Sequence, residues 1–187
     1  MKKILLKLLM FLSPGLMLAQ TSDDSVIFRI NAIYIDEVIE DGDEGVGAMA
    51  EIAFIIEQTE DVYQTLGFES GYITSEAEEL GIEVNTDLIP FFANYTIGGH
   101  LGDTGFIVEG GVGIGGVLVD IDVEGVSDDD VVFGGQFFGR LGYKLSDQAR
   151  LSFGIRYMIA DDPDFFGLEV TDTLNSLAFD AGLSFAF

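Results

Sequence analysis

Apolar and polar residues alternate along eight segments of this chain. The last segment shows the pattern most clearly, with apolar side chains at every second position: Leu177, Phe179, Ala181, Leu183, Phe185 and Phe187. Successive side chains of a strand point to opposite faces, so each segment is predicted to form a strand with one apolar face. The eight segments cover 26–35, 46–56, 64–73, 88–97, 105–118, 131–144, 149–159 and 175–187.

An even number of strands of this length suits a closed barrel that crosses a membrane. A tilted strand needs roughly 9–11 residues to span a bilayer, and bacterial barrels of this kind have even strand numbers. We therefore predict an all-β fold, an eight-stranded antiparallel up-and-down transmembrane β-barrel preceded by a cleavable signal peptide. A soluble barrel is the alternative, and it would bury the apolar face and turn the other face to water.

The face opposite the apolar one decides between these alternatives. It carries four arginines and four acids: Arg29, Glu51, Glu69, Glu109, Arg140, Arg150, Arg156 and Asp180. A water-facing surface gives no reason for so even a balance in a strongly acidic chain. A narrow interior does, because an unpaired buried charge is very costly. We predict that these side chains form an ion-pair network in the lumen, with individual pairings left open, and that the apolar face contacts lipid.

The first residues of the chain predict export. Two lysines after Met1 precede an apolar stretch from Ile4 to Leu12, and residues 18–20 offer a cleavage point. Residues 1–19 are therefore predicted to be a signal peptide, and residues 20–187 one outer-membrane barrel domain. Without the signal peptide, five basic residues stand against 33 acidic ones, a net charge of −28, which argues against a nucleic-acid partner. The chain has no cysteine, so neither disulfides nor thiol metal sites are expected.

Most of the acidic residues fall in four connections. These are predicted to be outer loops, and they hold 22 of the 33 acids: 36–45, 74–87, 119–130 and 160–174. The shorter connections 57–63, 98–104 and 145–148 are predicted to be periplasmic turns, which places both chain termini in the periplasm. Five tyrosines on the apolar face near strand ends are predicted to form an aromatic girdle at the membrane interfaces: Tyr34, Tyr72, Tyr95, Tyr143 and Tyr157. Only Tyr63 stands outside this pattern.

Several of these features together carry a family resemblance. They are the signal peptide, the stretch 89–95 (IPFFANY), the glycine-rich stretch 110–113 (GGVG) and the terminal Phe187. Across nearly all of 20–187 the chain resembles the small outer-membrane β-barrel domain family, which includes porin-family proteins and the transmembrane barrel of OmpA-like proteins. The resemblance implies that the barrel assembly machinery reads Phe187 and, on the same face, Phe185. It also implies a bacterial outer-membrane location, with lipid around a barrel that we expect to be a monomer.

Little in the chain favours an enzyme. The segment 111–116 reads GVGIGG and matches G-x-G-x-x-G, but strand alternation continues after it where a nucleotide site needs a helix. The single histidine, His100, lies in a predicted turn, and no motif gives it a catalytic partner. No cofactor is expected apart from loosely bound Ca²⁺ or Mg²⁺, for which clustered loop carboxylates are candidates: Asp128, Asp129, Asp130, Asp161, Asp162 and Asp164.

The size of the barrel indicates its function class. An eight-stranded barrel has an interior just wide enough for side chains to fill. We therefore expect a non-enzymatic barrel with a plugged lumen and a structural or surface-interaction role, whose extracellular partner the sequence does not name. Two alternatives stay open: a narrow porin-like channel for ions or small solutes, and divalent-cation or ligand binding by the acidic outer loops.

Overall fold

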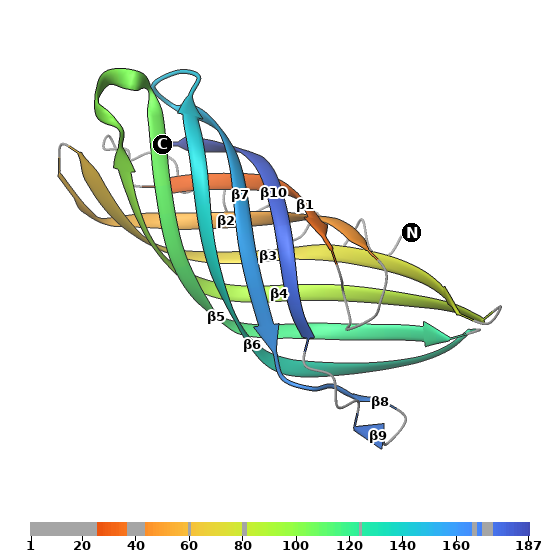
Figure 1. The fold of residues 1–187 in the computed structure, drawn as a ribbon. Coiled ribbons are helices and arrows are strands. Elements are labelled where there is room, and N and C mark those ends of the chain that lie inside the picture. Colours follow the sequence, from red (N-terminus) through yellow and green to blue (C-terminus); the bar gives the residue numbers. More distant parts are fainter. Residues whose placement is uncertain are drawn as a thin grey trace.

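Eight antiparallel strands close into a barrel in this computed structural model, which describes residues 26–36, 44–59, 61–79, 82–123, 125–165, 168–169 and 174–187. The strands are β1 (Val26–Ile35), β2 (Gly45–Gln58), β3 (Val62–Glu79), β4 (Ile82–His100), β5 (Phe106–Val123), β6 (Val126–Lys144), β7 (Ala149–Ala160) and β10 (Leu174–Ala186). Each barrel strand pairs with the next, and β10 pairs with β1 (Figure 1). The prediction of an all-β, eight-stranded up-and-down barrel is confirmed. The predicted signal peptide, 1–19, lies outside the described residues.

Short elements lie in two of the connections. β8 (Asp164–Phe165) and β9 (Leu168–Glu169) form a two-stranded sheet between β7 and β10, and the 3-10 helix η2 (Gly102–Thr104) lies between β4 and β5. Nowhere in the described part of the chain is there a helix with the length and apolarity needed to cross a membrane.

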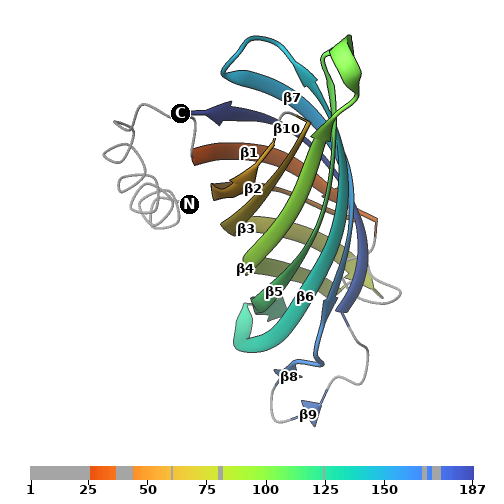
Figure 2. The ribbon, with the colours of Figure 1, turned by 90° about the vertical axis from the view of Figure 1, so that its left-hand side faces the viewer.

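The seam between the first and last strands is fully hydrogen-bonded at its start. The amide of Phe187 donates to the carbonyl of Val26 at 2.9 Å, and the amide of Val26 donates to the carbonyl of Phe187 at 3.3 Å. The ladder then continues to Ile35, which lies opposite Ala178. Figure 2 shows β1 and β10 side by side along this seam. Closure matters because backbone groups inside a bilayer have no water to bond.

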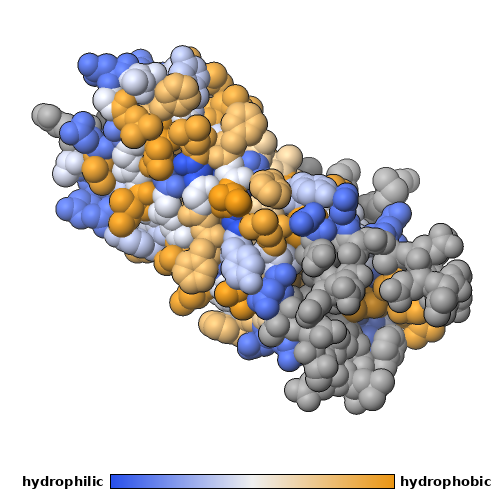
Figure 3. Space-filling model, in the orientation of Figure 1, coloured by the Kyte–Doolittle hydropathy of each residue, from blue (hydrophilic) through white to orange (hydrophobic). Residues whose placement is uncertain are grey.

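The side chains are arranged inside out compared with those of a soluble protein. Large apolar side chains point outward and are exposed, among them Ile114 at 65% and Phe133 at 64%. Charged side chains point into the lumen, where Glu69 is 0% and Arg156 1% exposed. Figure 3 shows apolar residues spread over the visible wall of the barrel. An apolar exterior around a polar interior is the arrangement of a transmembrane barrel.

The two ends of the barrel differ. At the turn end, where β1 begins and β10 ends, connections at 59–61, 101–105 and 145–148 join the strands. Two of these turns are shorter than predicted, because strand pairing continues into 57–63 and 98–104. At the opposite hairpin end, β3–β4 and β5–β6 run on as long hairpins (Figure 1).

The prediction of outer loops at 74–87 and 119–130 is wrong, because the two long hairpins occupy both segments. Most of 74–87 and 119–130 is strand, and we call these strand segments the hairpin extension: 74–79, 82–87, 119–123 and 126–130. Polar and acidic residues end the apolar alternation there, but the backbone ladder continues as far as Glu79, opposite Ile82. Most of the predicted loop 36–45 and part of 160–174 lie outside the described residues.

Candidate functional site: the charged belt in the lumen

One charged side chain from each of seven strands points into the middle of the lumen. We call these side chains the charged belt: Arg29, Glu51, Glu69, Glu109, Arg140, Arg156 and Asp180. None is more than 6% exposed. The remaining strand, β4, contributes the buried amide of Asn94. Strand register sets this level, since Arg29 lies opposite Glu51 and Glu51 lies opposite Glu69.

Arg156 joins four strands of the barrel. Its guanidinium forms two parallel hydrogen bonds with Glu69, from Nη1 to Oε2 at 3.0 Å and from Nη2 to Oε1 at 2.9 Å. Nη1 also donates to Oε1 of Gln136 at 2.7 Å, and Nη2 lies 3.3 Å from Oδ2 of Asp180. A bidentate pair is strong and geometrically specific. Arg156 on β7 is therefore fixed to β3 on the opposite wall and to its neighbours β6 and β10.

Arg29 makes a second connection across the lumen. Its Nη2 donates to both carboxylate oxygens of Glu109, at 2.9 and 2.8 Å, and its Nη1 bonds Glu51 on the adjacent strand. β5, which carries Glu109, is four strands away from β1 in the barrel order. Arg29 therefore ties opposite walls together in the same way as Arg156.

Arg140 lies between these two connections. Its nitrogens are 3.6–3.9 Å from carboxylate oxygens of all four belt acids. Its Cζ stands 4.1 Å from the centre of the Phe138 ring, within the range of a cation–π contact. Among the described residues, none of its nitrogens forms a direct hydrogen bond. Arg140 therefore acts mainly through its charge, as a shared counter-ion.

Tyr63 also belongs to this network, although the alternation pattern left it out. Its hydroxyl donates to Oε1 of Glu109 at 2.5 Å and accepts from Nη1 of Arg150 at 3.2 Å. Tyr63 is buried and shares the lumen-facing side of β3 with Glu69. Strand alternation, counted back from Glu69 in steps of two residues, predicts that Tyr63 faces the lumen. Arg150 was predicted as a full member of the network, but it lies half-buried toward the turn end.

Two amide side chains, Asn94 and Gln136, donate hydrogen bonds to acids of the charged belt. Asn94 donates to Glu51 at 3.2 Å and to Glu69 at 3.1 Å. Gln136 donates to Glu69 at 2.8 Å and to the amide oxygen of Asn94 at the same distance. Their inward direction follows from the alternation, whereas their partners depend on which walls face each other.

Replacing Tyr63 with phenylalanine is expected to lower the free energy of unfolding by about 1.5–3 kcal/mol, because Glu109 and Arg150 each lose a partner. Urea unfolding of the refolded barrel, followed by circular dichroism, measures this change. Tyr143→Phe is the matched control, since Tyr143 is 46% exposed on the outward face. Equal effects of the two substitutions would contradict a place for Tyr63 in the network.

Buried apolar side chains form a layer in the lumen on each side of the belt. The cluster toward the hairpin end contains Ile33, Ile35, Met49, Ile73, Leu88, Phe92, Val117, Val119, Val132, Met158, Ala160 and Ala178. A smaller cluster toward the turn end contains Ile27, Ala53, Tyr63, Ile107 and Ala186. The cavity in the hairpin-end cluster measures about 20 Å³, room for about one water molecule. The charged belt therefore lies between two apolar layers.

The carboxylates predicted as cation ligands are spread over several elements. Asp128, Asp129 and Asp130 lie in β6, so their side chains alternate between its two faces. Asp128 accepts a hydrogen bond from the next amide at 3.1 Å, and Asp130 does so at 2.7 Å. Asp161 and Asp162 follow β7, and Asp164 lies in β8. The described residues contain no group of three or more acidic or histidine side chains placed to hold a metal ion.

The glycine-rich segment and the histidine that could indicate an enzyme both lie in strands. The glycine-rich segment 111–116 lies within β5, so no helix N-terminus follows it. His100 is the last residue of β4 and lies opposite Ile107.

A row of three aspartates crosses the outward face of the hairpin extension. Asp87 lies opposite Asp120, and Asp120 lies opposite Asp129. Partial burial and the charges of Asp87, Asp129 and Asp122 raise the pKa of Asp120 above its ordinary value of 3.8. Like charges directly opposite each other destabilise a sheet. The row therefore costs stability when its carboxylates are ionised.

Replacing Asp120 with asparagine is expected to stabilise the barrel by roughly 0.2–1 kcal/mol at neutral pH. Well below pH 3.8 the carboxyl is protonated in both the folded and the unfolded state, so the gain disappears. It develops as the pH rises from that value through the raised pKa of the folded state. Thermal unfolding at both extremes measures it, with the exposed Asp103→Asn as control. A gain that is independent of pH would contradict repulsion within the row.

The predicted interfacial aromatics all point outward. Tyr34, Tyr72 and Tyr157 lie toward the hairpin end, and Tyr95 and Tyr143 toward the turn end. The ring of Tyr143 lies 5.1 Å from that of Phe106, centre to centre. Phe185 and Phe187 also point outward at the turn end, with exposures of 36% and 46%.

Solved structures of small outer-membrane barrels match this architecture. Neisserial surface protein A (NspA) gives a TM-score of 0.61 at 11% identity, with 88% of this chain and 98% of that one covered. Ail, the attachment invasion locus protein of Yersinia pestis, gives 0.56 at 11% identity, with 87% and 97% covered. The N-terminal β-barrel domain of Pseudomonas aeruginosa OprF gives 0.55 at 13% identity, with 88% and 98% covered. The chain has the fold of the small outer-membrane β-barrels.

At this level of identity, the likeness to other outer-membrane barrels concerns the fold. No protein-family model matches the sequence, and no curated protein sequence matches it either. Because nearly the whole of each matched structure is covered, the shared unit is a complete barrel.

Proposed function

We propose that this protein is a non-enzymatic barrel of the bacterial outer membrane, with a plugged lumen and a structural or surface-interaction role. The short connections of the turn end are typical of the periplasmic side. This orientation places both termini in the periplasm and the hairpin extension outside the cell. Phe185 and Phe187 then lie where the assembly machinery would meet the last strand.

One observation carries this proposal: the charged belt lies between two apolar layers inside the barrel. The belt cross-links opposite walls through Arg29 and Arg156. An eight-stranded barrel has little interior space beyond what its side chains fill. This filling favours a plugged barrel over the alternative of a narrow porin-like channel.

Single-channel recording of the refolded mature protein in a planar bilayer tests the plug. The wild-type protein is expected to give no discrete openings at neutral pH. Arg140→Ala removes the shared counter-ion and a large side chain from the centre of the lumen, so it is expected to raise conductance. Discrete openings of the folded wild-type barrel would support the channel alternative instead.

The aspartate row supports a second proposal, in which the outer face attracts cations. Ail is known in complex with sucrose octasulfate, a heparin analogue. A chain with a net charge of −25 would repel such a polyanion, so a surface partner here would be cationic. Calcium or magnesium screening is the simplest form of this interaction. It predicts that millimolar Ca²⁺ raises the melting temperature of the wild-type barrel more than that of an Asp120→Asn/Asp129→Asn variant, and equal shifts would contradict it.

A further inference from the structure

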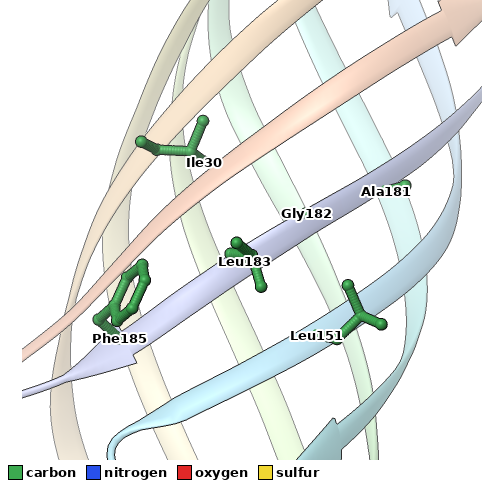
Figure 4. A pocket seen from close by; sticks show the side chains of 6 residues that line it. All are labelled: Ile30, Leu151, Ala181, Gly182, Leu183 and Phe185. Atoms are coloured by element: carbon green, nitrogen blue, oxygen red, sulfur yellow. The ribbon is translucent and has the colours of Figure 1, made fainter. Parts of the chain in front are cut away.

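A groove runs along the outer wall of the barrel near its seam. It is lined by Ile30 of β1, Leu151 of β7, and Ala181, Gly182, Leu183 and Phe185 of β10 (Figure 4). Its volume is about 360 Å³, near the lower limit of small-molecule sites. None of the lining side chains is charged or polar, so the groove suits an apolar occupant.

The register of three strands produces this shape. Ile30, Leu183 and Leu151 lie opposite one another and form a raised row across β1, β10 and β7. One pair further toward the hairpin end, Ala181 lies opposite Ala32, and Ala32 opposite Ala48. Small side chains beside a row of branched ones leave a depression. Gly182 lines the groove with its backbone only, since a Cβ added there would point into the lumen toward Asn31.

The position of the groove restricts what can fill it. Its walls are part of the exposed apolar outer surface of the barrel, where Ile30 is 45% and Leu183 is 41% exposed. The groove is therefore continuous with the surface that meets lipid. A second barrel would need about 20–30 residues on each side for a stable interface, many more than the six residues that line the groove. A single flexible hydrocarbon chain needs no larger surface.

We propose that this groove binds one acyl chain of a membrane phospholipid. The proposal rests on the membrane location given under Proposed function, but not on the plugged lumen. The groove extends from Ala181 toward Phe185, so the chain would come from the leaflet at the turn end. With no charged side chain in the lining, recognition depends on chain shape and not on the headgroup.

Filling the groove tests this proposal. Ala181→Leu places a branched side chain on its floor, and Ala93→Leu makes the same change on the outward face of β4, away from the groove. Each barrel is refolded into bilayers of phosphatidylethanolamine and phosphatidylglycerol and released into mild detergent, and native mass spectrometry counts the retained phospholipid. The wild type and Ala93→Leu are expected to retain one molecule. Ala181→Leu is expected to retain roughly tenfold less, since about two methylene groups lose their burial.

Circular dichroism of each variant establishes that the barrel is folded. Leu183→Ala is a second variant, which lowers one wall of the groove instead of filling its floor. The proposal is overturned if the wild type retains no phospholipid or if Ala181→Leu and Ala93→Leu retain equal amounts. It is also overturned if the wild type is a dimer that Ala181→Leu converts to monomer, because a second copy then fills the groove. Conductance of the wild type tests the plug separately.

Discussion

Replacing Arg156 with alanine is expected to destabilise the folded barrel by about 3–5 kcal/mol, the typical cost of removing one partner of a buried ion pair. The substitution removes the two bonds to Glu69 and the contact with Asp180. Both acids are fully shielded from water and would keep a poorly compensated charge. Arg140, at 3.6 Å from Glu69, would still offset part of that charge.

Chemical unfolding of the refolded barrel in micelles measures this loss. Arg150→Ala is the control, because Arg150 is half-buried and donates a hydrogen bond to the neutral hydroxyl of Tyr63. The control is expected to lose about 1 kcal/mol. If both variants unfold at the same denaturant concentration as the wild type, the belt contributes nothing to stability.

Replacing Gly115 with alanine is expected to cost about 3 kcal/mol, at the upper end of the usual range for overpacking. An added Cβ would overlap the carbonyl oxygen of Phe91 and lie 2.9 Å from its carbonyl carbon. These are backbone atoms of the neighbouring strand, which a side-chain rotation cannot move. The ladder between β4 and β5 would have to shift.

Gly110→Ala provides the comparison on the same strand. There the nearest atom to an added Cβ is the carbonyl oxygen of Phe138 at 3.9 Å, an ordinary contact. This variant is expected to fold with stability within about 0.5 kcal/mol of the wild type. Equal destabilisation by the two substitutions would contradict the close approach of Phe91 as the cause of the cost.

The alternation of side chains predicted the barrel and its two faces, because a strand on a lipid-facing wall must keep one face apolar. The same rule failed in the hairpin extension, where the strands continue although their outward face is no longer apolar. The segment around Asp87 and Asp120 is strand, yet its outward face is polar.

The sequence did not predict which side chains pair with each other in the lumen. Arg29 meets Glu109 across 80 residues because the barrel closes with a particular stagger. Alternation gives the direction of each side chain but not its height relative to the opposite wall. Tyr63 was missed for a simpler reason, since it lies next to a turn that the prediction made too long.

Fluorescence of a single tryptophan shows most directly which face of a strand meets lipid. The chain has no tryptophan, so a single one can report its surroundings. Phe137 is 57% exposed on the outer wall, and the adjacent Phe138 is 6% exposed in the lumen. In bilayers of brominated phospholipid, fluorescence of Phe137→Trp is expected to be strongly quenched and that of Phe138→Trp to be largely unchanged. The reverse result, or equal quenching of both, would contradict an apolar wall in lipid around a charged lumen.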